Sequence, residues 1–342
     1  MAYPKPLLDK TIEKRYESLN LPKETLSTLH RFFHACSNLY GVIDLDSMWN
    51  LYRELNQTQG LPPVRRRNLI EFSSVARRDG SVPYFVFEVE EIYLDEPHRD
   101  SSRLVVNKDV VSPGSWRYHG IYSIEQEAYG KPLFVPKDFL SWVNPPVPSE
   151  EKALLRFLEN LTVTANEVEK WGVKIKCEHK GEKLKDFVFE SAGYKMAYKW
   201  SNAEYEGGRK TVDHKHLEWL KKGLCSNAAE YLVYNAKKNF DYMLKGSQGF
   251  QQFFDDLYEM GVELTDLQSK ILLELLQDFI NNLHMYSNGG WTPKELGRIQ
   301  GPRKGPIAMD FGPGILKAME RGDIDRNEIE RMLKDYGMDP LN

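Results

Sequence analysis

Between Pro22 and Val111 the chain carries three amphipathic helical patterns followed by strand-like runs, and this order constrains the fold more than any other feature. In the first pattern apolar residues recur every three or four positions, as on one face of a helix, and Gly41 ends it. Asp44 is a suitable N-cap for the second helix, and Pro62 and Pro63 suit the start of the third. The sequence therefore predicts three consecutive helices.

The spacing of apolar residues changes at Tyr84. Residues 84–87, 92–94 and 103–106 are rich in β-branched and aromatic residues, which favour strands, and residues 95–97 have the composition of a turn. Three helices followed by a strand pair resemble a winged-helix module, so we expect such a module at the N-terminus. Winged helices bind DNA, RNA or proteins, and the fold alone does not decide among these roles.

Five arginines flank the third helix: Arg65, Arg66 and Arg67 at its start, and Arg77 and Arg78 at its end. Guanidinium groups on a helix that enters a groove could contact phosphates, which makes these residues candidates for nucleic-acid binding. The alternative is a solvated helix with ion pairs, because consecutive arginines point around a helix and cations favour its C-terminus. Acidic residues between 88 and 91 would repel a phosphate backbone if they faced the same side.

The composition indicates a globular protein of several domains. The 342 residues are 41% hydrophobic, and the formal net charge of -4 requires any nucleic-acid contact to rest on a local basic patch. Three widely spaced cysteines form no CxxC motif, which fits a reducing compartment. Neither a signal-peptide pattern nor an apolar run of membrane-spanning length is seen. We therefore expect a cytoplasmic protein without a membrane partner.

Proline clusters divide the chain, and the predicted fold class is α+β, predominantly α-helical. We expect a winged-helix-like domain at residues 1–111 and an irregular extension ending in a linker at residues 112–148. A mixed but mainly helical domain follows at residues 149–296, and a C-terminal connector with a helical hairpin at residues 297–342. The topology of residues 160–245 does not follow from the sequence.

Two capping boxes lie in the mainly helical domain. Thr265 and Gln268 begin the strongest amphipathic helix of the chain. Its expected continuous apolar face contains Leu267, Ile271, Leu272, Leu275, Phe279 and Leu283. Thr164 and Glu167 have the same spacing and predict a second, shorter helix.

Two short motifs resemble those of a family of uncharacterised bacterial cytoplasmic proteins. They are residues 39–43, Leu-Tyr-Gly-Val-Ile, and residues 281–296, which begin with Asn-Asn and end with Gly-Trp-Thr-Pro-Lys-Glu-Leu. Some relatives in that family continue into a SEC-C metal-binding tail. Such a tail needs clustered Cys and His ligands, and this sequence has neither after Leu296, so the metal role implied by the resemblance is not carried over.

Candidates for metal or phosphate chemistry are few. His214 and His216 would share a face in a strand and could ligate a metal, but the following residues favour a helix that begins at Asp213, so no metal site is expected. Arg303 and Lys304 lie in a glycine-bearing loop that could hold a phosphate, although its prolines remove backbone donors. No standard nucleophile, P-loop or dinucleotide motif is present, and no cofactor is predicted.

These observations favour an intracellular binding or regulatory protein without catalysis, whose N-terminal module contacts nucleic acid. Two alternatives stay open. One is a metal-assisted hydrolase with its site near His214 and His216, and the other is a scaffold whose partners are proteins.

Overall fold

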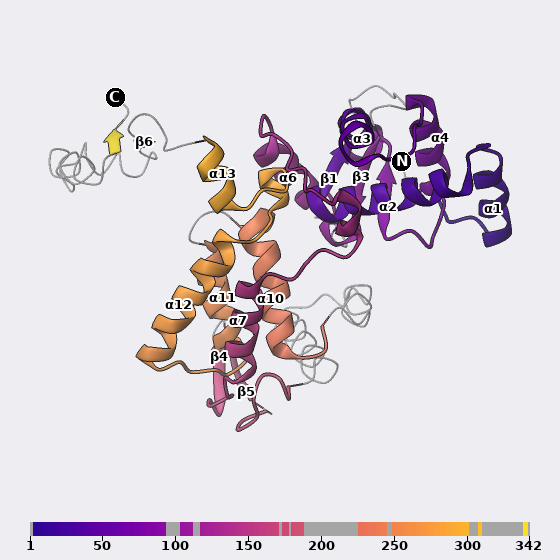
Figure 1. The fold of residues 1–342 in the computed structure, drawn as a ribbon. Coiled ribbons are helices and arrows are strands. Elements are labelled where there is room, and N and C mark those ends of the chain that lie inside the picture. The colour runs from indigo at the N-terminus through magenta and orange to yellow at the C-terminus, as the bar shows by residue number, and fades with distance from the viewer. Residues whose placement is uncertain are drawn as a thin grey trace. The chain divides into compact units, whose positions relative to one another are not determined.

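A computed structural model describes residues 3–93, 103–111, 117–170, 173–177, 179–187, 225–244, 248–300, 307–309 and 338–340 (Figure 1). The chain forms two compact units, Met1–Pro293 and Lys294–Asn342. The described part is mixed α+β and mostly helical, which confirms the predicted class. None of its helices combines the length and apolar character that crossing a bilayer requires.

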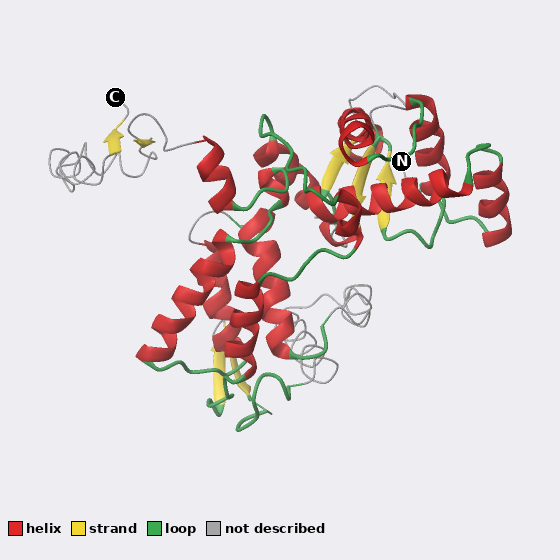
Figure 2. Ribbon diagram, in the orientation of Figure 1, coloured by secondary structure: helices red, strands yellow, loops and turns green. Residues whose placement is uncertain are grey.

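The first unit begins with a module of helices and a small antiparallel sheet (Figure 2). The sheet has the order β1-β3-β2, and β3 pairs Val106 with Val42 on one side and with Phe85 on the other. The elements, in order, are α1 (Asp9–Glu17), α2 (Lys23–Tyr40), β1 (Val42–Asp44), α3 (Leu45–Gln59), α4 (Arg66–Ala76), β2 (Tyr84–Phe87), α5 (Val89–Ile92) and β3 (Leu104–Asn107).

The three predicted helices are α2, α3 and α4. Asp44 caps α3 as expected, since its side chain accepts the N–H groups of Asp46 and Ser47. The two prolines precede the third helix instead of opening it, because Arg65 is the N-cap of α4.

The strand prediction needs two corrections. Residues 89–92 form the short helix α5, because the Glu91 carboxylate accepts the N–H of Glu88 at 2.9 Å and closes a helical turn directly after β2. Strand β1, which completes the sheet, has only three residues, too few for a period of two to be recognised.

Aromatic side chains fill the core of this module around α2. Phe33 on α2 is fully buried, and its ring centroid lies 4.8 Å from that of Phe72 on α4 and 5.8 Å from that of Tyr84 on β2. These contacts fix α4 and the sheet on one face of the longest helix, which leaves the opposite side of α4 at the surface.

The rest of the first unit is mainly helical, and α7, α10, α11 and α12 pack together (Figure 1). Its elements are α6 (His119–Ala128), η4 (Phe139–Val143), α7 (Ser149–Glu159), β4 (Glu167–Lys170), β5 (Val173–Lys176), α10 (Ala228–Lys238), η5 (Asn239–Met243), α11 (Gln248–Glu259), α12 (Asp266–Asn281) and η6 (Tyr286–Asn288).

Two predictions for this region are corrected. The predicted short helix at Thr164 and Glu167 is the start of the β4–β5 hairpin, whose alternating charged and β-branched residues have a strand period. The capping box of α12 is confirmed, but its apolar face is not continuous. Phe279 and two leucines are buried, whereas Leu267 and Ile271 are exposed.

The second unit contains most of α13 (Pro293–Gln300) and a parallel strand pair, β6 (Ile307–Met309) with β7 (Met338–Pro340). The predicted helical hairpin, between residues 314 and 336, lies outside the described residues, as does the loop at 301–306.

Candidate functional site

The N-terminus of α4 carries the three adjacent arginines Arg65, Arg66 and Arg67, all exposed. The backbone N–H of Arg65 donates to the Asn68 side-chain oxygen at 3.0 Å, which closes the first turn of the helix. A helix N-terminus exposes unpaired N–H groups and a partial positive charge, both of which favour anions. The three arginines therefore begin the helix at the end where the backbone itself also attracts a phosphate.

Two of these arginines form ion pairs at the surface. Arg66 pairs with Asp46 on α3, and Arg67 donates to Glu71 at 2.7 Å within α4. The side chains of Arg66 and Arg67 are 47% and 85% exposed. Ion pairs this exposed contribute about 0–1 kcal/mol, so a phosphate can replace the carboxylate at little cost.

Arg77, at the other end of α4, has a different role. Its guanidinium donates to both carboxylate oxygens of Glu91, at 2.5 and 2.7 Å, and to the Val86 carbonyl. The side chains of Arg77 and Glu91 are only 13% and 1% exposed. Arg77 is thus a buried link between α4 and the sheet, and the structure does not support it as a nucleic-acid contact.

Arg103 completes this buried cluster from the start of β3. It donates to Glu88 at 2.9 Å and to the hydroxyl groups of Ser73 and Ser74 on α4. Glu88 and Glu91 are therefore compensated by Arg77 and Arg103. Two of the three acidic residues that would repel a phosphate are thus paired with arginines inside the module.

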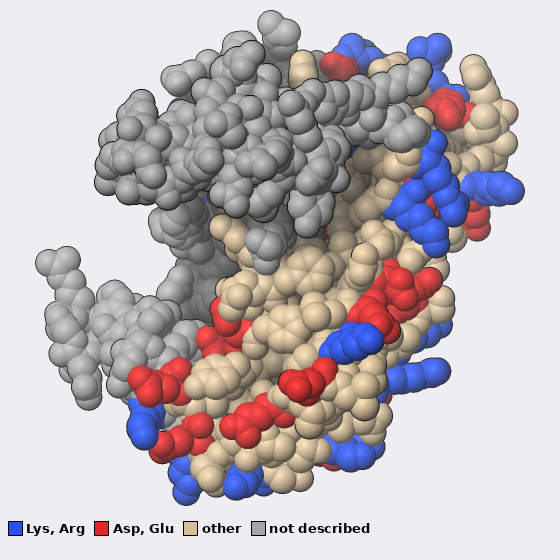
Figure 3. All heavy atoms as spheres, turned by 90° about the vertical axis from the view of Figure 1, so that its left-hand side faces the viewer, with Lys and Arg blue, Asp and Glu red and all other residues tan. Residues whose placement is uncertain are grey.

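Arg78 is half-buried at the C-terminal end of α4 and forms no ion pair with another described residue. Its carbonyl accepts the N–H of Leu7 at 2.9 Å, so the N-terminal segment runs past this end of the helix. Arg78 consequently does not lie with the arginines at the helix start. Figure 3 shows one face of the molecule, on which both basic and acidic side chains lie on the described surface.

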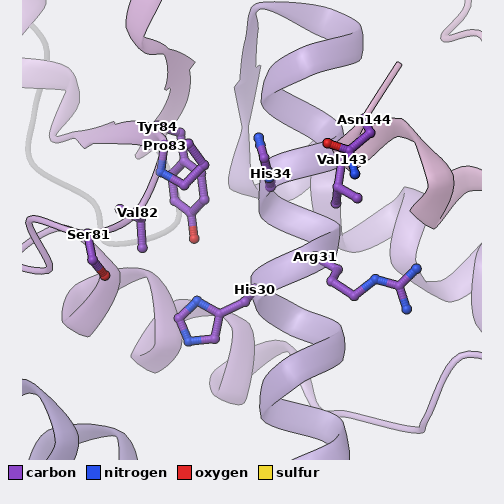
Figure 4. Close-up of a pocket in the computed structure, with 9 residues that line it drawn as sticks. All are labelled: His30, Arg31, His34, Ser81, Val82, Pro83, Tyr84, Val143 and Asn144. Carbon is purple, nitrogen blue, oxygen red and sulfur yellow. The ribbon is translucent and has the colours of Figure 1, made fainter. Parts of the chain in front are cut away.

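A pocket of about 410 Å³ lies between α2 and residues 81–84 (Figure 4). His30 and His34 line it from successive turns of α2, and burial lowers the pKa of both imidazoles, which keeps them uncharged at neutral pH. The Tyr84 hydroxyl is buried and has no hydrogen-bond partner among the residues that the structure describes. This pocket therefore provides hydrogen-bonding groups without a charge from its histidines.

A second hollow, the Asp109 cleft, has a volume of about 380 Å³ and is rich in titratable groups. Its lining comes from the β3 end of the first module, the 142–148 segment, the α10–η5 helix and the 283–286 segment. The lining residues are Asn38, Asn107, Asp109, Trp142, Pro145, Pro146, Val147, Pro148, Glu151, Tyr234, Lys237, Lys238, Asp241, Tyr242, Leu283, His284 and Tyr286.

The two motifs behind the family resemblance meet beside this cleft. A Cβ on Gly41 would lie 2.5 Å from the ring of Tyr286, and one on Gly290 would lie 3.1 Å from the Leu39 side chain. The Tyr40 hydroxyl donates to the carbonyl of Phe134, whose N–H donates to the Gly289 carbonyl. Residues 39–41 and 286–290 therefore form one packed junction in the first unit.

The remaining sequence candidates are not brought together in the described structure. His214, His216, Arg303 and Lys304 lie outside the described residues. Among the residues that the structure does describe, no group of three or more His, Cys, Asp or Glu side chains is placed to hold a metal. The three cysteines are free thiols, and burial raises the pKa of each, which lowers their reactivity.

Comparison with known protein families, characterised proteins and solved structures found no match to this chain. The resemblance to the SEC-C-related family stays a prediction from the two motifs.

Sequence reasoning missed Asp109, Tyr234 and Lys238, which gather in the Asp109 cleft. No local motif could have found them, because they are distributed over segments more than 100 positions apart. Lys238 lies in the last turn of α10, where a lysine is common, so its residue type carried no signal either.

Proposed function

We propose that this protein is a non-catalytic nucleic-acid-binding protein that contacts the phosphate backbone through the N-terminus of α4. The contact residues are Arg65, Arg66 and Arg67. Arg77 is excluded from the set because it holds the buried ion-pair cluster, and Arg78 because it lies at the far end of the helix.

The observation that carries this proposal is the position of the arginines in the order of elements. Helices α2, α3 and α4, with β1 after the first and with β2, α5 and β3 after the third, resemble the element order of a winged helix, which supports the proposal. In helix-turn-helix proteins the N-terminal residues of the last helix face the groove. The three exposed arginines occupy this position on α4.

The chemistry of the surface favours backbone contact over base readout. Arg67 and Glu71 alternate along the exposed face of α4, and Ser74, one turn further, donates to the Ile70 carbonyl and accepts from Arg103. Few side chains on this face are therefore available to read base edges. We expect binding that depends strongly on salt and weakly on sequence.

Fluorescence anisotropy of the full chain against labelled duplex DNA, single-stranded DNA and RNA at low salt tests the proposal. The decisive variant replaces Arg65, Arg66 and Arg67 with alanine. The matched control replaces Lys10, Lys14 and Arg15 with alanine, because these are three exposed cations on α1 of the same module.

The proposal predicts that the α4 variant loses affinity while the α1 variant keeps it. Equal losses in both variants would show that only total charge matters, and would refute a specific role of α4. Absence of binding to all three nucleic acids at low salt would refute the function itself, and a protein partner would then be sought.

A further inference from the structure

The pocket between α2 and residues 81–84, which we call the His30 pocket, takes its lining from three segments of the first unit. His30 and His34 come from α2, Tyr84 from the start of β2, and Asn144 from the residue after η4. The volume of about 410 Å³ falls in the range of small-molecule sites, about 300–1,000 Å³. The arginines at the start of α4 do not line this pocket, so a ligand in it is independent of the role proposed for α4.

Several polar side chains of this pocket have no protein partner, in contrast to those of the Asp109 cleft. Among the described residues, none hydrogen-bonds to the ring nitrogens of His30 or His34 or to the side-chain amide of Asn144. The Tyr84 hydroxyl, which is buried and also unpaired in the described structure, points toward His30 (Figure 4). Polar groups in protein walls are normally paired, so this set indicates a ligand that supplies hydrogen bonds.

The two imidazoles are held in place by α2 and its neighbours. The centroid of the His30 ring lies 4.8 Å from that of Tyr16 on α1 and 4.8 Å from that of Phe72 on α4, and both contacts are edge-to-face. His34 follows four residues later and therefore lies on the same side of the helix. The two rings thus form a row on a rigid element, which suits a preorganised site.

The described lining of the pocket is nearly uncharged. Burial lowers the pKa of both His30 and His34, so each imidazole is neutral at pH 7. Arg31 is the one charged residue among the described lining residues. Its guanidinium extends away from His30 and Tyr84 (Figure 4) and donates to the Leu140 carbonyl at 3.4 Å.

Asp79 is the carboxylate that acts on His30, and it does not line the pocket. It accepts the Tyr16 hydroxyl at 3.1 Å, and the backbone N–H and the hydroxyl of Ser81 at 2.9 and 2.6 Å. These donors occupy the Asp79 carboxylate. The pocket therefore offers an opposite charge neither to a cation nor to an anion placed between the two histidines.

The polar groups of this pocket also share one hydrogen-bonding property, since each both donates and accepts. A neutral imidazole has one N–H and one free nitrogen, and an amide has N–H groups and an oxygen. A carboxylate or phosphate only accepts and an ammonium only donates, whereas a hydroxyl does both on one atom and rotates to suit its partners. Val82, Pro83 and Val143 add an apolar surface, which matches the C–H face of a sugar ring.

We propose that the His30 pocket binds a neutral sugar, whose hydroxyl groups are hydrogen-bonded to His30, His34 and Asn144. One C–H face of the sugar ring packs on Val82 and Pro83. The site binds its ligand without a covalent step.

Saturation-transfer NMR of the full chain with millimolar D-glucose, D-galactose, D-mannose and N-acetyl-D-glucosamine tests this proposal. The matched charged ligands are the corresponding uronates and amino sugars, which keep the ring. At least one neutral sugar should bind, and its charged counterparts should bind about threefold more weakly or worse, because each loses a hydroxyl that both donates and accepts. Methyl glycosides distinguish the source, since they keep the affinity if the ligand is a residue of a glycan and lose it if the ligand is a free sugar.

Variants and histidine spectra assign the binding to this pocket. His34→Leu and Asn144→Ala should each lower the affinity by about fivefold or more, since each removes a hydrogen bond to the sugar. Asn281→Ala, an exposed change on α12, is the matched control. In nitrogen-15 spectra of the wild type, the sugar should shift the ring signals of His30 and His34 but not those of His179, which keeps the test decisive if a variant does not fold.

Three results would overturn the proposal. The first is the absence of binding by every neutral sugar of the panel at millimolar concentration. The second is binding of the uronates or amino sugars that equals or exceeds that of the neutral sugars, which would show that charge selects the ligand. The third is sugar binding that leaves the ring signals of His30 and His34 unchanged.

Discussion

Replacing Gly41 with alanine tests the close packing of this glycine against Tyr286. The loss in the free energy of unfolding has one part from the backbone conformation and one from the steric contact, and a control glycine separates the two. Gly41 ends α2 with φ 69° and ψ −48°, a conformation that side chains other than glycine rarely adopt. Alanine there would cost about 2 kcal/mol for the backbone. Its Cβ would also lie 2.5 Å from the Tyr286 ring, and forcing a methyl group into a packed core costs about 2 kcal/mol more.

Gly60 is the matched control, because it ends α3 with the same φ of 69° but has no atom within 4 Å of the position that a Cβ would occupy. Its ψ of 29° places it in the ordinary left-handed region, which a side chain tolerates better than the ψ of −48° at Gly41, so Gly60→Ala should cost only about 1 kcal/mol for the backbone. Urea unfolding should show a loss of about 4 kcal/mol for Gly41→Ala against about 1 kcal/mol for Gly60→Ala. Equal losses would refute the tight contact with Tyr286.

A double variant tests the same contact directly. Tyr286→Ala removes Cγ and Cδ2, the two ring atoms that the new methyl group would strike. If steric conflict is the cause, Gly41→Ala should cost about 2 kcal/mol less in the Tyr286→Ala background than alone. Strict additivity of the two losses would contradict the reasoning.

Three further predictions concern buried polar groups. Tyr84→Phe should raise the free energy of unfolding by about 1 kcal/mol, because it removes a buried hydroxyl that has no partner among the described residues. Tyr40→Phe should lower it by about 1 kcal/mol, since the Tyr40 hydroxyl donates to the Phe134 carbonyl at 2.8 Å. Urea unfolding that gives both changes the same sign would contradict this. Glu91→Gln should lower the free energy of unfolding by about 3 kcal/mol, because it leaves the buried Arg77 partly uncompensated. Glu71→Gln, in the exposed pair with Arg67, should lower it by less than about 1 kcal/mol. Equal losses would refute the structural role of Arg77. Burial raises the pKa of Asp241 to about 6, so between about pH 4 and about pH 6 the folded state holds a proton that the unfolded state releases. The contribution of this carboxyl to the free energy of unfolding should therefore fall as the pH rises through this range. Urea unfolding of Asp241→Asn across the same range should lack this decrease, and a pH dependence equal to that of the wild type would contradict the prediction.

The long helices of this chain could be predicted from sequence because their apolar residues repeat over several turns. Helix α2 and the capped start of α12 follow this rule. The apolar face of α12 was predicted as continuous because periodicity shows which residues share a face, but not how much of that face a neighbouring helix covers. Leu267 and Ile271 lie beyond the covered part.

Short elements escaped prediction because a few residues decide them. Strand β1 depends on pairing with β3, more than 60 positions away, and α5 depends on one hydrogen bond from Glu88 to Glu91. The roles of the arginines also required the structure. The sequence places both Arg67 and Arg77 near a carboxylate, but only in the structure is the partner of Arg77 a buried glutamate from a neighbouring element.

The Asp109 cleft was beyond sequence reasoning for the same physical reason. Asp109 lies after β3, whereas Tyr234 and Lys238 lie on α10. Only tertiary packing brings the Asp109 carboxylate to the Tyr234 hydroxyl, which Lys238 also contacts. The candidate histidines, by contrast, attracted notice because they are neighbours in the chain.

The salt dependence of nucleic-acid affinity tests the central claim most directly. If Arg65, Arg66 and Arg67 each neutralise one phosphate, the slope of log affinity against log salt on duplex DNA should be about 2.7 less steep in the triple alanine variant than in the wild type. The part of the affinity that these arginines supply would fall about 40-fold between about 50 and about 200 mM salt. A triple variant with the wild-type slope and affinity would contradict the account.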